Sequence, residues 1–196
     1  MIAWYRHAEI KHGRVAMAGF VGYLVQSLGA TWPGNLQTAF KPGIPMVADL
    51  PTISFADISA AGGPPDQWDA LPTAAKVQIL LGVMFLELWG ESSIGFEAAG
   101  KQHYMRGGQP GAYPRFDGLP LNLYDPFNLF KKASEEKKAR GRNAEVNNGR
   151  LAMIGLFSLI AESKVPGSVP FLDQFDFPAY AGNVMVPFEG QFSLLG

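Results

Sequence analysis

The sequence EIKHGRVAM, at residues 9–17, returns later in the chain as EVNNGRLAM, at residues 145–153. The longer segments 8–26 and 144–162 align without a gap and share seven identical residues of the types Ala, Glu, Gly, Arg and Met. Each copy places a glutamate, an arginine five residues later, and then an apolar run. Because internal self-similarity of this kind indicates repeated architecture, we expect the chain to use one helical unit twice.

Three segments are expected to form long helices, at about residues 8–30, 73–91 and 139–163. The first contains 18 residues without a charge, at 15–32, which reaches the length of a membrane-spanning candidate. The second follows Pro72, a residue type that favours helix starts. The third has an apolar run of only 11 residues, at 151–161, so it spans a membrane only if the motif before it is immersed too.

The repeat also predicts the topology. Both copies read in the same direction, so in a membrane they would enter from one face, and the second helix must carry the chain back. We therefore predict an all-α membrane protein with three transmembrane helices in a single domain, residues 1–196, joined by long Pro/Gly-rich loops. The first and third helices would be related by a pseudo-twofold axis along the membrane normal. Arg6, Lys11 and the basic stretch 131–142 would then share one face, on the side of insertion.

The charges of the motif need partners on another helix. At about 100° per residue, Glu9 and Arg14 lie roughly 140° apart on a helix and do not face each other. An unpaired charge at the bilayer centre costs about 2.5 to 3.5 kcal/mol on insertion scales. Reciprocal ion pairs solve this, Glu9 with Arg150 and Glu145 with Arg14, across a helix crossing that small residues such as glycine allow. On a purely structural interpretation, locking this crossing is all that the charges do.

That interpretation leaves the residue three positions after each glutamate unexplained. His12 and Asn148 lie within about 60° of Glu9 and Glu145 on the helix face. Each offers a lone pair, and each neutralised carboxylate keeps a free oxygen. Such donors suit the one open axial position of a magnesium chlorin, which accepts oxygen or imidazole nitrogen.

The second helix offers the same chemistry at two more positions. Gln78 and Glu87 both carry side-chain oxygens within an otherwise apolar run. For Gln78, a hydrogen bond between helices is an equally good explanation.

The composition excludes several functional classes. The chain has 196 residues, no cysteine and a net charge of −1. No thiolate site can form, and a basic nucleic-acid footprint is absent, so we expect no nucleic-acid partner. The first residues contain no signal or transit peptide. Either the protein is made where it works, or a targeting segment is missing from this sequence.

The two motifs, with the intervening helix VQILLGVMFLELW, resemble the three transmembrane helices of the chlorophyll-binding light-harvesting complex family over nearly the whole chain. The resemblance implies central chlorophyll ligands and ion-pair partners. The ligands are Glu9, His12, Glu145 and Asn148, the ion-pair partners are Arg14 and Arg150, and the further ligands on the second helix are Gln78 and Glu87.

Three more residues are weighed against the same resemblance. The family often has glutamine at the position of Glu162, and this departure counts against a ligand there; a charged Glu162 would face the lumen. His103 is expected to be a solvated loop residue, with ligation of a peripheral chlorophyll as the alternative. His7 is expected near lipid headgroups at the helix mouth.

Within the family, KHGR, NNGR and the tail KVPGSVPFL resemble the red-lineage chlorophyll a/c antennae. This implies chlorophyll a, chlorophyll c, fucoxanthin or peridinin, and a diadinoxanthin-type xanthophyll. It also implies a multi-pass protein of the chloroplast thylakoid membrane whose presequence has been removed. The partners would be thylakoid lipids, neighbouring antenna subunits and a photosystem core, with the loop 96–118 favouring photosystem I.

Three alternatives remain open at this point. A photoprotective family member would quench excitation, with Asp173, Asp176 or Glu189 as pH sensors. A colourless, soluble helical interaction protein would use the ion pairs only to lock a bundle, and the 18-residue uncharged run speaks against it. An enzyme with Glu9 and His12 as acid and base would need a pocket that the repeat does not suggest, so we expect no enzyme.

Overall fold

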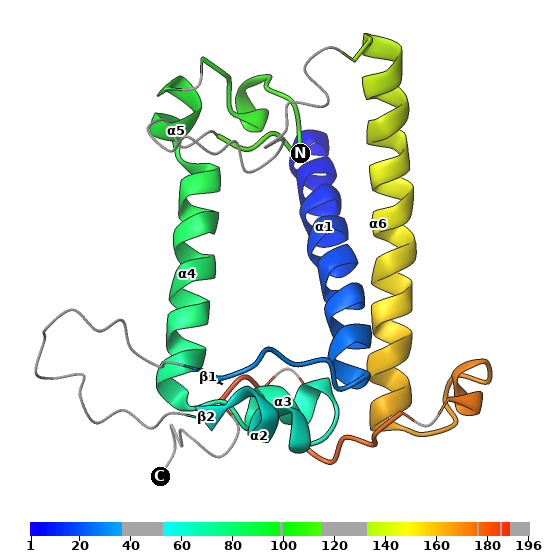
Figure 1. Ribbon diagram of the computed structural model, residues 1–196. Helices are drawn as coiled ribbons and strands as arrows, with labels where there is room; N and C mark the ends of the chain where they lie inside the picture. Colours follow the sequence, from blue (N-terminus) through cyan, green and yellow to red (C-terminus); the bar gives the residue numbers. More distant parts are fainter. Residues whose placement is uncertain (37–52, 99, 115–132, 176, 185, 189–196) are drawn as a thin grey trace, which may run out of the picture. The chain divides into compact units, whose positions relative to one another are not determined.

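A computed structural model gives the arrangement of the chain and describes residues 1–36, 53–98, 100–114, 133–175, 177–184 and 186–188. Helices dominate, which confirms the predicted helical class (Figure 1). The elements in chain order are α1 (Ile2–Ser27), β1 (Asn35–Leu36), β2 (Ile53–Ser54), α2 (Phe55–Ala60), α3 (Pro64–Asp69), α4 (Thr73–Glu91), α5 (Ser93–Ala98), the 3-10 helix η2 (Tyr104–Arg106), α6 (Glu135–Lys164) and the 3-10 helix η3 (Leu172–Gln174).

The three long helices have local reasons for their bounds. α4 has the predicted bounds, whereas α1 begins and ends earlier than predicted. The chain leaves α1 at Gly29, which has a positive φ of 71° that glycine adopts without strain. α6 is longer than predicted because the charged stretch before the motif is rich in strong helix formers, and the Ser134 hydroxyl accepts the amide of Lys137 at its start.

The early end of α1 affects which helices are long and apolar enough to span a membrane. Among the described residues, α4 is the one helix long and apolar enough to cross a membrane by length and composition. The uncharged run 15–32, predicted to be the clearest span, is only partly helical, because α1 ends at Ser27. Any 18-residue window within α1 therefore includes charged residues of the motif. Three crossings remain a prediction.

The chain divides into two compact units. The first comprises Met1–Gly19 and Val83–Ile154, and the second comprises Phe20–Gly82 and Gly155–Gly196. The prediction of a single domain therefore stays a prediction.

In the first unit, α1 and α6 lie side by side (Figure 1), and their backbones are in direct contact at two glycines. A Cβ atom built on Gly149 would lie 2.8 Å from the Cα atom of Gly13, closer than real atoms approach. Gly13 and Gly149 occupy the same position in the two copies of the motif. Glycine is therefore required on both helices for this contact.

Also in the first unit, a turn at Gly111 is attached to α1 through both of its backbone groups. The Gly111 amide donates to His7 Nδ1 at 3.1 Å, and its carbonyl accepts from Arg14 Nη1 at 2.7 Å. A Cβ atom at Gly111 would collide with Ile10 at 2.9 Å, and φ there is +79°. The turn that follows η2 is thereby fixed against the motif.

The second unit contains structure in segments predicted as connections. The Ser54 hydroxyl accepts the Asp57 amide at the start of α2, and α3 begins with a proline after Gly63. The tail packs onto these helices: the Tyr180 hydroxyl donates to Asp69 at 2.8 Å and Trp68 Nε1 donates to the Pro187 carbonyl at 2.9 Å. Local capping signals therefore organise a stretch that has no long periodicity.

Candidate functional site

The structure brings the predicted ion-pair partners together in the first unit. Arg14 Nε donates to Glu145 Oε1 at 2.6 Å. Reciprocally, Arg150 places Nε at 2.7 Å and Nη2 at 2.6 Å from Glu9 Oε1. The two pairs flank the Gly13–Gly149 contact, so repeat-related residues meet across α1 and α6.

Each glutamate keeps one oxygen for another partner. Both arginines contact Oε1, and among the described residues no group pairs with Oε2 of Glu9 or Glu145. The glutamate side chains are 34% and 25% exposed, respectively. Each carboxylate is therefore charge-compensated on one side and open on the other.

His12 is held in a defined tautomer. Its Nδ1 lies 2.7 Å from the Ala8 carbonyl, one turn earlier in α1. Because a carbonyl can only accept, Nδ1 carries the proton, and neutral His12 has its lone pair on Nε2. The side chain is exposed and Nε2 has no partner in the described part of the chain. Asn148, at the equivalent position of α6, is also exposed, and its amide has no partner among the described residues.

The two α4 residues differ in their surroundings. Gln78 is exposed and lies in the second unit, where it takes part in an interaction. Glu87 lies in the first unit with its side chain 56% exposed, and its Oε2 accepts from Lys11 Nζ at 2.7 Å. Glu87 is therefore ion-paired to α1, a contact that the sequence analysis did not anticipate.

The His103 ring is only partly solvated, with its side chain 17% exposed, and both of its nitrogens have partners. Its Nδ1 accepts the Met105 amide at 3.2 Å at the start of η2, and its Nε2 lies 3.3 Å from Glu91 Oε2. With Nδ1 accepting, neutral His103 carries its proton on Nε2 and donates it to Glu91. Neither ring nitrogen has a lone pair to offer, so the alternative of peripheral ligation is disfavoured.

Glu162 does not face the lumen as a free charge. It is 5% exposed, and its two oxygens accept the amides of Gly167 at 2.6 Å and Val169 at 2.8 Å. The carboxylate thus holds the turn that follows α6. Both oxygens are used in this way, which explains why a glutamate can stand there without acting as a ligand.

His7 is buried, at 4% exposure, and stacks on Tyr104 with ring centroids 4.0 Å apart. Because Nδ1 accepts from Gly111, its proton lies on Nε2, 3.3 Å from Glu91 Oε1. That approach lacks hydrogen-bond geometry, so we regard it as a close electrostatic contact. The turn at Gly111 covers the ring, so His7 does not present it at the surface, and its position near lipid headgroups stays a prediction.

Sequence analysis missed Glu91 altogether. Glu91 is the last residue of α4. Its carboxylate accepts from Lys11 Nζ at 2.9 Å and from the Tyr104 hydroxyl at 2.9 Å, and it lies close to His7 and His103. Burial raises the pKa of Tyr104, and so do the hydrogen bond that its hydroxyl donates to Glu91 and the negative charge of that carboxylate, so the hydroxyl keeps its proton. The signal was present in the sequence, because Glu87 and Glu91 are like charges one turn apart and need a cation from elsewhere.

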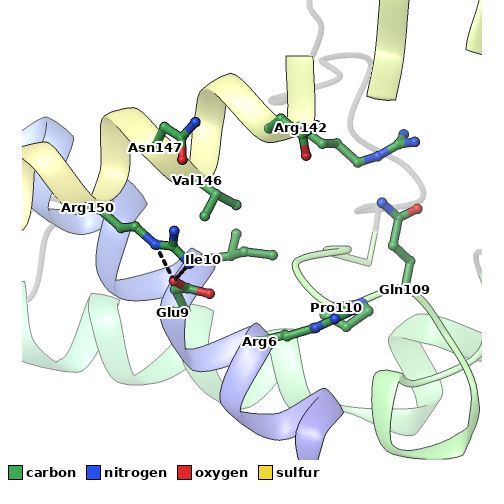
Figure 2. Close-up of a pocket in the computed structure, with 10 residues that line it drawn as sticks. Arg6, Glu9, Ile10, Gln109, Pro110, Arg142, Val146, Asn147 and Arg150 are labelled. Carbon is green, nitrogen blue, oxygen red and sulfur yellow. Dashed lines mark hydrogen bonds and ion pairs between the residues drawn. The ribbon is translucent and has the colours of Figure 1, made fainter. Parts of the chain in front are cut away.

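A cavity of about 530 Å³ lies beside the Glu9–Arg150 pair (Figure 2). Its walls come from α1, the turn before Gly111, and the first half of α6. The lining residues are Arg6, Glu9, Ile10, Gln109, Pro110, Arg142, Asn143, Val146, Asn147 and Arg150. The compensated carboxylate of Glu9 therefore borders a cavity that also contains apolar and amide groups.

The donor set fits a magnesium chlorin better than a bare ion. The described residues contain no group of three or more His, Asp or Glu side chains placed to hold a metal. A chlorin already supplies most of the magnesium coordination, so the protein needs only one hard or imidazole donor for each ring. Glu9, Glu145, His12 and Asn148 each have one such donor without a partner among the described residues.

This arrangement defines a helical protein whose motif glutamates and arginines pair across two helices and present isolated metal donors. A family model described as "Chlorophyll A-B binding protein" matches residues 1–164. The chain belongs to that chlorophyll-binding family.

The chain is also similar to proteins named as fucoxanthin-chlorophyll a-c binding proteins. The chain is 32% identical over 169 residues to the chloroplastic fucoxanthin-chlorophyll a-c binding protein of Trieres chinensis. The aligned region covers 86% of this chain and 69% of the relative. It is 29% identical over 161 residues to fucoxanthin-chlorophyll a-c binding protein D of Phaeodactylum tricornutum, covering 82% and 64%. For the fucoxanthin-chlorophyll a-c binding protein of Chattonella marina var. antiqua the identity is 30% over 166 residues, covering 85% and 59%. The chain thus spans about two thirds of the length of these relatives.

Proposed function

We propose that this protein is a light-harvesting antenna subunit that binds chlorophyll a, chlorophyll c and fucoxanthin. The observation that carries the proposal is a set of donors on the paired helices that have no partner in the described part of the chain: one oxygen on each of Glu9 and Glu145, and one donor on each of His12 and Asn148. Family membership and the names of the relatives support the pigment class. They favour fucoxanthin over peridinin, while a diadinoxanthin-type xanthophyll rests on the resemblance alone.

The protein's part in this function is to hold and orient pigments. A bound chlorophyll would supply the absorption, the energy transfer and a magnesium ion that Glu9, Glu145, His12 or Asn148 would hold. Arg14 and Arg150 neutralise the two glutamates, so each can present an oxygen at low electrostatic cost. The Ala8 carbonyl accepts from His12 Nδ1 and so orients the ring, as hydrogen-bond acceptors commonly orient histidines that bind metals.

The proposal places the protein in the chloroplast thylakoid membrane as a multi-pass subunit. α4 has the length and composition of a span. α1 and α6 would cross as a pseudo-twofold pair, with the reciprocal ion pairs compensating charges at membrane depth. Exposed apolar side chains on both helices, including Val15, Val21, Leu151 and Ile154, would face thylakoid lipid or pigment.

The proposed partners are neighbouring antenna subunits and a photosystem core, with photosystem I favoured over photosystem II by the loop at 96–118. A quenching role would need acidic sensors. Asp173 is exposed in η3. Asp176 and Glu189 lie outside the described residues.

The decisive experiment is reconstitution of the chain with a mixture of these pigments in detergent, followed by purification and absorption spectroscopy. We expect red and blue chlorophyll bands together with carotenoid absorption near about 500 nm, at a fixed pigment-to-protein ratio. A purified protein with aromatic absorbance alone would refute the proposal and favour the interaction protein.

A further inference from the structure

Lys11 joins α1 to two carboxylates of α4. Its Nζ lies 2.7 Å from Glu87 Oε2 and 2.9 Å from Glu91 Oε1. The Lys11 side chain is 22% exposed, whereas those of Glu87 and Glu91 are 56% and 41% exposed. The ammonium group therefore lies on the inner side of both carboxylates.

The two carboxylates differ in what they leave open. Both oxygens of Glu91 have neighbours: Lys11 and His7 at Oε1, and Tyr104 and His103 at Oε2. Glu87 uses Oε2 only, and within the described residues nothing pairs with its Oε1. Glu91 is thus a structural hub, and Glu87 retains an exposed acceptor.

Glu87 therefore repeats the arrangement seen at the two motif glutamates. In each case a carboxylate from one helix is neutralised through one oxygen by a cation from another helix, at 2.6 to 2.7 Å. In each case the second oxygen is open. A lysine takes the place of the arginine because its flexible stem lets one ammonium reach two acids that are one helical turn apart.

The repeat itself shows that Lys11 has a separate task. Its equivalent in the second copy is Asn147, which is neutral and lines the cavity beside Glu9 (Figure 2). The positions equivalent to Glu9, Gly13 and Arg14 are all identical in the two copies. Of the two motif helices, α1 alone makes an ion pair with α4 among the described residues, so only the first copy needs a cation at this position.

We propose that Lys11 is a positioning residue for a third charge-compensated chlorophyll ligand, Glu87. This inference rests on the proposed function, because it assumes that the chain binds chlorophyll. Lys11 would lower the cost of an ionised carboxylate on the apolar α4 and turn its free Oε1 outward. Without Lys11, Glu87 would lose its counter-charge and the contact that holds its side chain in place, and its outward acceptor would be lost.

The test is a rescue experiment on the reconstituted protein, with chlorophyll per chain as the readout. Lys11→Met and Glu87→Leu should each lose the same single chlorophyll, visible as the same missing component in the absorption difference spectrum. The double variant Lys11→Met/Glu87→Gln should regain it, because glutamine is a neutral oxygen donor that needs no counter-charge. Lys137→Met, the same change at an exposed lysine of α6, should keep the full count.

The outcomes separate this inference from the proposed function. If wild-type protein binds chlorophyll but Lys11→Met keeps the full count, the role of Lys11 is refuted and the antenna proposal stands. If Lys11→Met loses the pigment and Glu87→Gln does not restore it, Lys11 is merely structural and the inference is refuted. If wild-type protein binds no chlorophyll, the antenna proposal itself fails.

Discussion

The side chain of His12 shows how one backbone contact decides a residue's chemistry. The hydrogen bond from Nδ1 to the Ala8 carbonyl leaves Nε2 as the lone-pair donor of the neutral ring and fixes the direction in which it points. His103 differs from His12, because its Nδ1 accepts a backbone amide and its Nε2 faces a carboxylate. The same residue type is therefore a candidate ligand at one position and a structural residue at the other.

This contrast leads to a matched prediction. His12→Leu should reduce the chlorophyll content of the reconstituted protein by one per chain, because it removes the free Nε2. His103→Leu should leave the count unchanged, because that ring has no lone pair to offer. Pigment extraction and quantification against protein will check both, and a full count in His12→Leu would rule out the assignment.

The two ion pairs should differ in their importance for stability. Arg14 and Glu145 are 33% and 25% exposed, whereas Arg150 is 58% exposed. Arg14→Leu should therefore destabilise by about 1.5 to 3 kcal/mol, as expected when a charged hydrogen-bond partner is lost. Arg150→Leu should cost less, because solvent screens its pair.

Thermal unfolding monitored by circular dichroism will rank the two variants. Adding Glu145→Gln to Arg14→Leu should recover part of the loss, because it removes the stranded charge. Equal destabilisation by both arginine variants would contradict the ranking.

At the scale of elements, the approach of α1 and α6 depends on the absence of side chains at Gly13 and Gly149. A methyl group at either position would meet the opposite backbone rather than a flexible side chain. Backbone cannot move aside without separating the helices, so both ion pairs depend on this contact. The helix crossing and the two ion pairs therefore form together or not at all.

Gly149→Ala should consequently destabilise the protein by about 1 to 3 kcal/mol, the usual cost of overpacking. Gly141→Ala is the matched control, since it lies in the same helix with nothing within 4 Å of the added Cβ. It should be neutral or stabilise by up to about 1 kcal/mol through helix propensity. Unfolding midpoints compare the two, and an unaffected Gly149→Ala would exclude the close crossing.

The turn after α6 offers a second prediction at this scale. Glu162→Gln should destabilise by about 1 to 3 kcal/mol, because an amide has one acceptor oxygen for two backbone N–H groups. Limited proteolysis should become faster near residues 165–169. Glu136→Gln, at a side chain 87% exposed, should change neither readout.

At the scale of the whole molecule, membership of the chlorophyll-binding family rests on a match that covers residues 1–164. Membrane spanning rests on less, because α4 is the one described helix that meets the length and composition criterion. The motif helices carry the charges that their proposed ligand role requires, and these charges lower their hydropathy. The proposed function and the weak hydropathy of α1 and α6 would therefore have the same physical origin.

A spectroscopic prediction belongs to this scale. In the reconstituted protein, excitation of fucoxanthin near about 500 nm should produce chlorophyll a fluorescence with an excitation spectrum that follows the absorption spectrum. Efficient transfer requires pigments held at fixed distances, which free pigments in detergent do not provide. A strongly shortened chlorophyll fluorescence lifetime at mildly acid pH would favour the quenching role over light harvesting.

The sequence by itself determined the motif, its duplication, the helical class and the need for charge partners on another helix, because these follow from spacing and helix geometry. It also predicted the bounds of α4, whose apolar run starts directly after a proline. Only the tertiary structure decided the roles of Lys11, Glu91, His7 and Glu162. The partners of Lys11, Glu91 and His7 lie far away in the chain, and those of Glu162 lie in the turn just after α6; no periodicity relates any of these residues to one another. Whether a polar group is open to a ligand or already satisfied depends on those contacts, and so it could be read only from the folded chain.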